Sequence, residues 1–305
     1  MSIDWSSSIQ APLGAHPPEL LKDFHQGRFT SAVGTKLTLS NWVTPDIVRY
    51  AELLQHLGPK ACTHTYFTSG RDEVVDKGLR CLRFNRPKAD IVIGLRDQYV
   101  GHTTAAARSL SEPIGDPKRF SWFDWPKVEH NIDAVTAAIE QYGKNRILGV
   151  VVELIGEKTA YVADNEFLTQ LSQLNIPLIF VETASALGRN GQTLFMSDSL
   201  PVKPNMVWWY TGAQLGHVFV DDQHYVSKPL TLISTWDGDE ISIRRTYRHL
   251  IVARECLVKG TALKFHNACR EVISLPMSGQ GLWQAIEFPL KPIGLKHASW
   301  HTGMN

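Results

Sequence analysis

The order of apolar and polar residues along the chain predicts an alternation of helices and strands. Residues 45–57 carry apolar side chains at helical spacing, and residues 147–154 form an almost wholly apolar run, typical of a central parallel strand. Further strands are predicted at 65–68, 89–95, 177–182, 206–210, 216–220 (as an antiparallel return) and 281–288, and further helices at 72–84, 128–142, 165–174 and 239–272. Such an alternation indicates an α/β fold with a mostly parallel sheet.

The length of the chain allows more than one domain. With 305 residues, 43% of them hydrophobic, it can bury a large core in one large domain or in a large and a small one. A break near residues 236–238 predicts three parts: an N-terminal segment (1–44), a large domain (45–236) and a small C-terminal domain (237–305).

Charge and cysteine content narrow the classes of partner. Lys and Arg number 31 against 30 Asp and Glu, which argues against nucleic acid or an anionic membrane surface as the main partner. No run of about 18 apolar residues is present, and residues 1–5 do not resemble a signal peptide. Four widely spaced cysteines form no metal-binding Cys-x-x-Cys pair, so we expect reduced thiols in a cytoplasmic protein without a metal site.

Two loops that follow predicted strands carry candidate ligand-binding residues. Ser69, Gly70 and Arg71 lie between a strand and a helix, where backbone amides can hold a phosphate; an ordinary capped turn is the alternative. Tyr99 could stack on a planar ligand or pack on the core, and His102 could act as an acid or a base near neutral pH.

Two carboxylates end neighbouring predicted strands. Glu153 closes the strand at 147–153, and Glu182 closes the next buried strand. Because ligands collect at the carboxyl ends of strands in open α/β sheets, both could do acid–base work. The alternative is that both hold loops through hydrogen bonds to the backbone.

Residues 178–191 and 204–212 resemble two segments of the class III aminotransferases, which bind pyridoxal phosphate (PLP). Val181 stands where that family has the aspartate that pairs with the pyridine nitrogen, and Thr183 follows the retained Glu182. Thr211 stands where the family has its Schiff-base lysine. The resemblance implies a shortened PLP-enzyme fold type I with a mixed, mostly parallel sheet covered by helices, a reduced small domain and a homodimer.

The resemblance also assigns roles to the loops. It implies phosphate binding for Ser69, Gly70 and Arg71, and cofactor stacking for Tyr99. Thr235 matches the family threonine that reaches the phosphate across the dimer interface.

Without the lysine no internal aldimine forms, and without the aspartate the pyridine ring is a poor electron sink, so normal transamination is not expected. A different alignment would place Lys228 in the site, although an exposed loop is the favoured position for it.

Three hypotheses follow. The first is an enzyme that performs lysine-independent chemistry on a small amine-, carboxylate- or phosphate-bearing metabolite. Its candidate catalytic residues are Glu182, Glu153, His102 and His217, with Tyr99 as an orienting group. The second is a pseudoenzyme that binds a ligand or a protein partner. The third is an enzyme that holds PLP or pyridoxamine phosphate (PMP) noncovalently, with His217 in place of the lysine.

Overall fold

The computed structural model describes residues 17–35, 42–111 and 122–286. The helices are α1 (Pro18–His25), α2 (Thr30–Thr35), α3 (Pro45–Leu57), α4 (Arg71–Asn85), α5 (Ala105–Leu110), α7 (Ile132–Tyr142), α8 (Asn165–Gln173), α9 (Glu240–Val258) and α10 (Thr261–Val272). The strands are β1 (His64–Thr68), β2 (Ile91–Leu95), β3 (Lys127–Val128), β4 (Ile147–Glu153), β5 (Leu178–Val181), β6 (Met206–Tyr210), β7 (Gly216–Val220), β8 (Met277–Gln280) and β9 (Trp283–Ile286).

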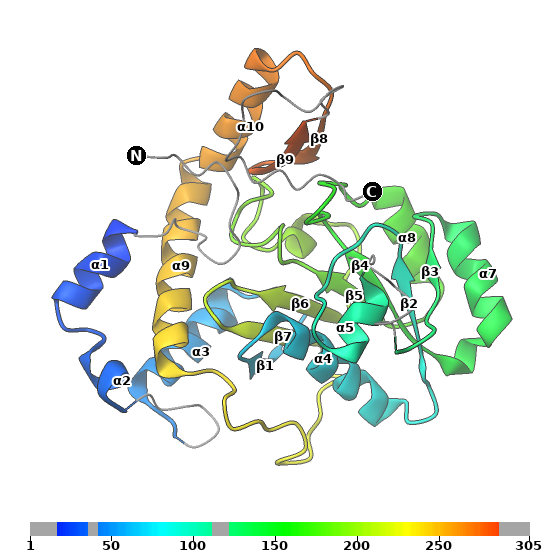
Figure 1. The fold of residues 1–305 in the computed structure, drawn as a ribbon, viewed down its shortest axis with the longest axis horizontal. Coiled ribbons are helices and arrows are strands. Elements are labelled where there is room, and N and C mark those ends of the chain that lie inside the picture. The colour runs from blue at the N-terminus through cyan, green and yellow to red at the C-terminus, as the bar shows by residue number, and fades with distance from the viewer. Residues whose placement is uncertain (1–16, 36–41, 112–121, 287–305) are drawn as a thin grey trace.

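Seven strands form the central sheet in the order β1-β7-β6-β5-β4-β2-β3 (Figure 1). Strands β2 to β6 pair in parallel, and β7 runs antiparallel to both β6 and β1. Strand β1 therefore points the same way as β6, and the chain leaves β1, β2, β4, β5 and β6 at one edge of the sheet, called here the carboxyl edge.

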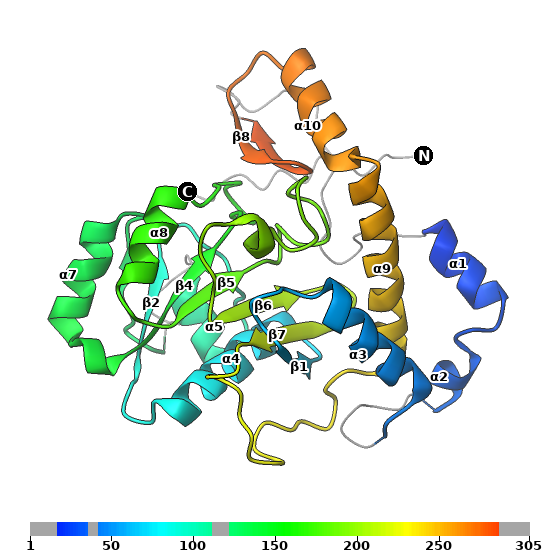
Figure 2. The same cartoon turned by 180° about the vertical axis from the view of Figure 1, so that it is seen from behind.

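Helices cover both faces of this sheet. Residues of α4 and α5 pack on one face together with Val181 and Trp208, and residues of α3, α7, α8 and α9 pack on the other with Phe180 and Trp209. Helix α5 lies in front of the sheet in Figure 1, and α3 lies in front of it in Figure 2. Helix α10 and the hairpin of β8 and β9 form a small lobe above the carboxyl edge.

Local capping explains where the helices begin. The Thr44 hydroxyl accepts a hydrogen bond from the Ile47 amide at 3.4 Å, and Pro45 occupies the first turn of α3. The Asp239 carboxylate accepts hydrogen bonds from the amides of Ile241 and Ser242 at the start of α9, both at 3.1 Å. These contacts satisfy amides that the helix itself leaves without partners.

The predicted α/β fold with a mostly parallel sheet is confirmed, and the predicted strands at 147–154, 177–182, 206–210 and 216–220 correspond to β4 to β7. The single long helix predicted at 239–272 is wrong. Gly260 adopts a left-handed φ of +64°, which ends α9 and separates it from α10. Residues 287 and 288 of the last predicted strand lie outside the described residues, and the division into three domains stays a prediction.

Within the described ranges, no helix is both long enough and apolar enough to cross a lipid bilayer.

Helix α4 approaches the sheet closely because Gly78 has no side chain. A Cβ atom added to Gly78 would lie 2.1 Å from Nε1 of Trp208, which is 1% exposed on β6. The indole therefore fills the place of a side chain on α4.

We expect Gly78→Ala to lower the free energy of unfolding by about 1–3 kcal/mol, because the methyl group overpacks a rigid indole. Gly34→Ala is the matched control, since an added Cβ at Gly34 has no neighbour within 4 Å. Urea unfolding of both variants measures the difference. Equal stability of the two variants would contradict the close contact.

Candidate functional site at the carboxyl edge

Arg71 lies at the centre of the candidate site. It is the first residue of α4, and its Cζ lies 5.0 Å from the ring centre of Tyr99 and 5.5 Å from that of Tyr210. Its Nη1 atom lies 3.0 Å from a carboxylate oxygen of Glu157. Burial, the largest single influence, lowers the pKa of Arg71. The charge and hydrogen bond of Glu157, together with the charges of Tyr99 and Glu153, outweigh it, so the net pKa shift is upward.

The loop between β4 and α8 supplies two charged residues to the site. Glu157 pairs with Arg71, and the Lys158 ammonium lies 4.7 Å from the ring centre of Tyr99. Tyr99 therefore has two cations within cation–π distance. We call Arg71, Tyr99, Glu153, Glu157, Lys158 and Tyr210 the carboxyl-edge cluster.

Glu153 joins the cluster to the sheet. One carboxylate oxygen accepts a hydrogen bond from the Tyr99 amide at 2.9 Å, and the other accepts one from the Glu157 amide at 2.8 Å. Burial and, to a lesser degree, the neighbouring charge of Glu157 raise the pKa of Glu153 to about 8. Most Glu153 side chains are therefore protonated at neutral pH.

The loop before α4 uses its amides internally. The Glu73 carboxylate accepts hydrogen bonds from the amides of Ser69 and Gly70, at 2.9 and 3.0 Å. The Ser69 hydroxyl donates to the carbonyl of Trp236 at 2.8 Å. This is the capped turn that the sequence left open as the alternative to a phosphate site.

Tyr99 and His102 form a hydrogen-bonded pair, with 2.5 Å between the tyrosine oxygen and Nδ1 of the histidine. The Asp72 carboxylate holds the loop that follows, because it accepts hydrogen bonds from the amides of His102, Thr103 and Thr104. The imidazole of His102 is exposed, and the Tyr99 ring is largely buried.

Glu182 is fully enclosed. Its carboxylate accepts hydrogen bonds from the Met196 amide (2.6 Å), the Ser197 amide (3.0 Å) and the Ser185 hydroxyl (3.0 Å). Burial raises the pKa of Glu182, and these three donors oppose the shift. Both carboxylate oxygens are engaged by these donors, which fits the loop-holding role considered for Glu182.

The ends of β5 and β6 are closed by short local contacts. Val181 is buried beside Trp208, and the carbonyl of Thr183 accepts a hydrogen bond from Nη1 of Arg189 at 2.8 Å. The hydroxyl of Thr211 accepts a hydrogen bond from the Ala213 amide at 3.1 Å, inside the hairpin between β6 and β7.

His217 lies on the opposite face of the sheet from the carboxyl-edge cluster. Its Nε2 is 2.6 Å from the hydroxyl of Tyr50 on α3, and its ring stacks on Trp209 with the ring centres 4.7 Å apart. Side chains alternate across a strand, so the ring cannot face both sides. This placement does not support the use of His217 in place of the lysine, and that role stays a prediction.

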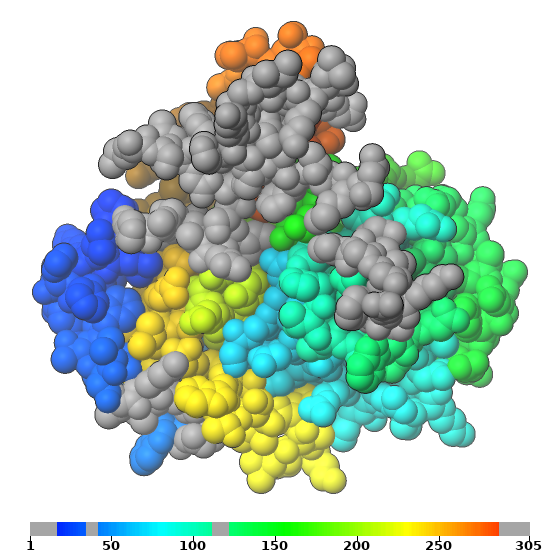
Figure 3. All heavy atoms as spheres, in the orientation of Figure 1, coloured from blue at the N-terminus to red at the C-terminus, as the bar shows by residue number. Residues whose placement is uncertain are grey.

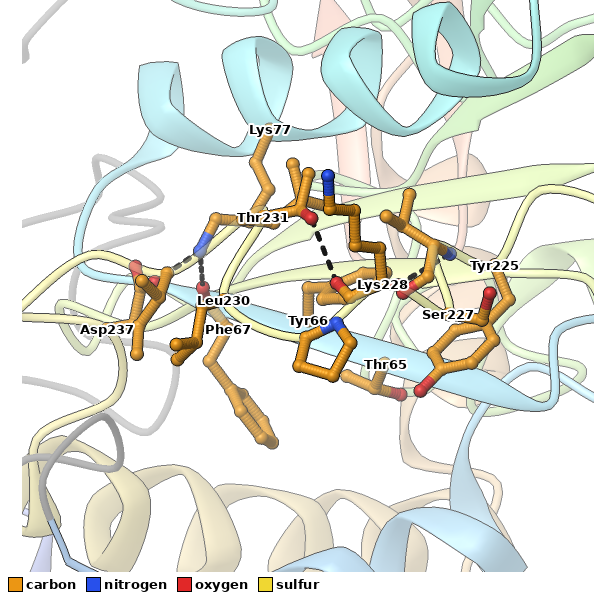
Figure 4. A pocket seen from close by; sticks show the side chains of 14 residues that line it. Thr65, Tyr66, Phe67, Lys77, Tyr225, Ser227, Lys228, Leu230, Thr231 and Asp237 are labelled. Atoms are coloured by element: carbon orange, nitrogen blue, oxygen red, sulfur yellow. Dashed lines mark hydrogen bonds and ion pairs between the residues drawn. The ribbon is translucent and has the colours of Figure 1, made fainter.

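Lys228 and Thr235 are exposed and belong to the loop that follows β7. This loop, coloured yellow, lies at the lower surface in Figure 3. Lys228 lines a cavity of about 450 Å³ beside β1, shown in Figure 4, rather than the carboxyl-edge cluster. The buried amine in this cavity belongs to Lys77 of α4, which bonds to the Phe67 carbonyl at 2.8 Å and pairs with Asp237.

The fold matches solved transaminase structures. A lysine aminotransferase from M. tuberculosis aligns with a TM-score of 0.75 and 21% identity, over 92% of this chain and 76% of the other. A transaminase from the marine bacterium Virgibacillus gives 0.76 and 18%, over 92% and 72%. An omega-transaminase from Thermomicrobium roseum gives 0.71 and 18%, over 87% and 70%.

The chain therefore has the α/β architecture of the PLP fold type I transaminases, and the resemblance to class III aminotransferases holds at the level of the fold. No family model matches the sequence, and no curated protein matches it.

The sequence interpretation missed several members of the site. Glu157, Lys158 and Tyr210 were not among the candidates, because a loop glutamate and lysine look like ordinary solvated charges. Glu73, which caps α4, was not among the candidates either. Its position three residues after Gly70 was a usable signal, since a capping box has this spacing.

We expect Lys77→Met to lower the free energy of unfolding by about 3–5 kcal/mol, because it leaves the Asp237 carboxylate buried without its partner. Lys77→Met combined with Asp237→Asn should recover part of the loss. Arg146→Met, which breaks the exposed pair with Asp90, should cost far less than Lys77→Met. Chemical denaturation measures all three, and a similar cost for Lys77→Met and Arg146→Met would contradict the buried pair.

Acid should destabilise the fold through His217. Burial lowers its pKa to about 3, below the value of the unfolded chain, so stability that is present at neutral pH is lost as the pH falls below about 6.5. From pH 7 to pH 5 we expect a loss of about 2 kcal/mol from this residue.

Urea unfolding at pH 7 and pH 5 tests the assignment to His217. His217→Phe should reduce the loss on acidification, and His56→Gln, at an exposed histidine of α3, should leave it unchanged. An unchanged loss in His217→Phe would show that the acid sensitivity lies elsewhere.

Proposed function

We propose that this chain is a pseudoenzyme of the transaminase fold, which binds a small molecule at the carboxyl-edge cluster and does not perform lysine-dependent transamination. The observation that carries the proposal is the position of Arg71. Its guanidinium group lies against Tyr99, the residue that the resemblance assigns to stacking on the cofactor ring. An ion pair with Glu157 holds it there.

The surrounding residues do not fit PLP. Glu73 uses the amides of Ser69 and Gly70, which are the expected phosphate donors. The Thr211 side chain has no amine and bonds within its own hairpin, and Val181 offers no acid to a pyridine nitrogen. A noncovalent PLP or PMP site therefore has little support, and we derive no chemistry through either group.

A second candidate function is lysine-independent acid–base chemistry on a small metabolite. The observation in its favour is Glu153, whose pKa of about 8 suits a general acid near neutral pH, next to the Tyr99–His102 pair. We rank it second because Glu153 is 2% exposed and both its oxygens already accept backbone hydrogen bonds. Glu182 and His217, the other acid–base candidates, are enclosed.

We also propose a cytoplasmic homodimer. The loop that carries Thr235 exposes large apolar side chains, with Leu230 80%, Ile233 51% and Trp236 56% exposed. A second copy would cover such a surface. The four cysteines are free thiols, in keeping with a reducing compartment. Light scattering after gel filtration tests the dimer, and a monomeric mass would contradict it.

Incubation with PLP, borohydride reduction and peptide mass mapping tests the loss of Schiff-base chemistry. We expect no stoichiometric pyridoxyl adduct on the natural protein. Thr211→Lys alone should also remain unmodified at residue 211, because Arg71 still lies against Tyr99. Thr211→Lys with Arg71→Ser should gain an adduct at residue 211.

A stoichiometric adduct on one lysine of the natural protein would contradict the proposal, and mapping to Lys228 would support the alternative alignment. Lys77 is a useful internal reference in the peptide map. Its amine is buried and paired, so we expect it to stay unmodified in every variant.

A further inference from the structure

Helix α9 brings additional cations to the carboxyl edge. The hydroxyl of Thr246 lies 3.4 Å from that of Thr211, which places this turn of α9 directly at the end of β6. Arg245 precedes Thr246. Burial raises the pKa of the nearby Tyr210, and the charge of Arg71, a backbone hydrogen bond at Gln214 and, more weakly, the charge of Arg245 oppose this shift. Arg245 is thus a neighbour of the carboxyl-edge cluster.

Arg189 is a second cation beside the cluster. It is 8% exposed, its Nη1 donates to the carbonyl of Thr183 after β5, and its Cζ lies 5.8 Å from the ring centre of Trp283. Burial lowers the pKa of Arg189 to about 10, and the charge of Glu157 opposes this shift. A guanidinium group held in so little solvent is costly unless an anion compensates it.

His249 lies within range of the charges of both arginines. It lies one turn after Arg245 on α9, is 2% exposed, and its Nδ1 has no hydrogen-bond partner within the part of the chain that the structure describes. Burial lowers its pKa to about 3, and the charges of Arg245 and Arg189 add to the shift. Both arginines therefore lie close to a neutral, buried imidazole with an unsatisfied polar atom.

The charges around this edge do not balance. Four cations lie around it: Arg71, Lys158, Arg189 and Arg245. Among the described residues, Arg71 is the one of these four cations that forms an ion pair, and its partner is Glu157. The nearby Glu153 is mostly protonated at neutral pH. An anion would compensate the excess positive charge, whereas a cationic amine would increase it.

We propose that the site binds a small dianion with carboxylate or phosphate groups. Arg189 and Arg245 bind this anion, and Arg71 leaves its ion pair with Glu157 to pair with the anion instead. Guanidinium groups suit both kinds of anion because their N–H donors match the two oxygens of a carboxylate or phosphate. Glu157 then acts as an internal stand-in for one ligand group. The inference rests on the proposed small-molecule function and names its ligand class.

Isothermal titration and thermal melting of the full chain with succinate or inorganic phosphate test the proposal, with sodium chloride at matched ionic strength as reference. We expect saturable binding of at least one probe and a higher melting temperature. A response to succinate alone identifies a carboxylate ligand, and a response to phosphate alone identifies a phosphate ligand.

Two substitutions locate the binding site. Arg245→Gln should weaken binding about tenfold or more, because it removes a charge-assisted hydrogen-bond donor. Arg189→Gln should act in the same direction, although its burial makes Arg245→Gln the cleaner test. Arg146→Gln is the matched control, since this exposed arginine pairs with Asp90 away from the cluster, and it should bind as the natural protein does.

Glu157→Gln provides a test with the opposite sign. Removing the internal counter-ion of Arg71 should tighten binding of the same probe several-fold, because the added anion no longer competes with Glu157. Glu129→Gln, at an exposed glutamate paired with Arg96, should leave the affinity unchanged. A purely structural role of Glu157 would give weaker binding and a lower melting temperature.

Three results would overturn the ligand inference. They are no saturable binding of either probe, an equal loss of affinity in Arg146→Gln and Arg245→Gln, and an unchanged or weaker affinity in Glu157→Gln. The borohydride experiment separates these from failure of the proposed function. If the protein forms no pyridoxyl adduct and binds neither anion, the proposed absence of transamination stands and the proposed dianion site is wrong.

Discussion

The contact between the Trp208 indole and the backbone of Gly78 sets the distance between α4 and the sheet. Because α4 lies this close, its first residue, Arg71, reaches the rings of Tyr99 and Tyr210 at the carboxyl edge. Lys77 directly precedes Gly78, and its amine reaches the Phe67 carbonyl and Asp237. The packing of Trp208 on β6 against Gly78 on α4 thus positions both the candidate site and a buried ion pair.

Electrostatics then determines what the carboxyl edge can hold. A buried guanidinium group is tolerated where aromatic faces and a carboxylate replace its water, and Arg71 has both. Glu153, a few residues before Glu157 on the same segment, avoids a second buried negative charge because its pKa is raised to about 8. Protonation of Glu153 leaves the cations in excess, and this excess is a property of the whole edge rather than of one residue.

Much of the sheet could be predicted from the sequence, because β4 and β5 are buried on both faces and read as continuous apolar runs. The position of Glu153 and Tyr99 near one edge followed from the parallel strand order. The orientation of His217 did not follow, because the pairing of His217 with Trp209 fixes its face and depends on the register of β6 and β7.

The surroundings of the side chains at the strand ends also could not be predicted from the sequence. Glu153 and Glu182 end adjacent strands and have the same carboxylate group, yet they face different surroundings. Glu182 points to the amides of Met196 and Ser197, fourteen or more residues later in the chain, and Glu153 points to Tyr99, far earlier. Only the folded chain brings these donors together, so no local pattern separates a loop-holding carboxylate from one beside the site.

Several polar groups at the carboxyl edge find their hydrogen-bond partners within the chain. A buried polar atom needs such a partner, because leaving it without one costs free energy. Thr211 bonds inside its hairpin, Glu73 caps α4, and Glu182 holds the turn at Met196. Within the described part of the chain, Arg189 and Arg245 near His249 form no ion pair, so an anion is the ligand that we infer for this edge of the protein.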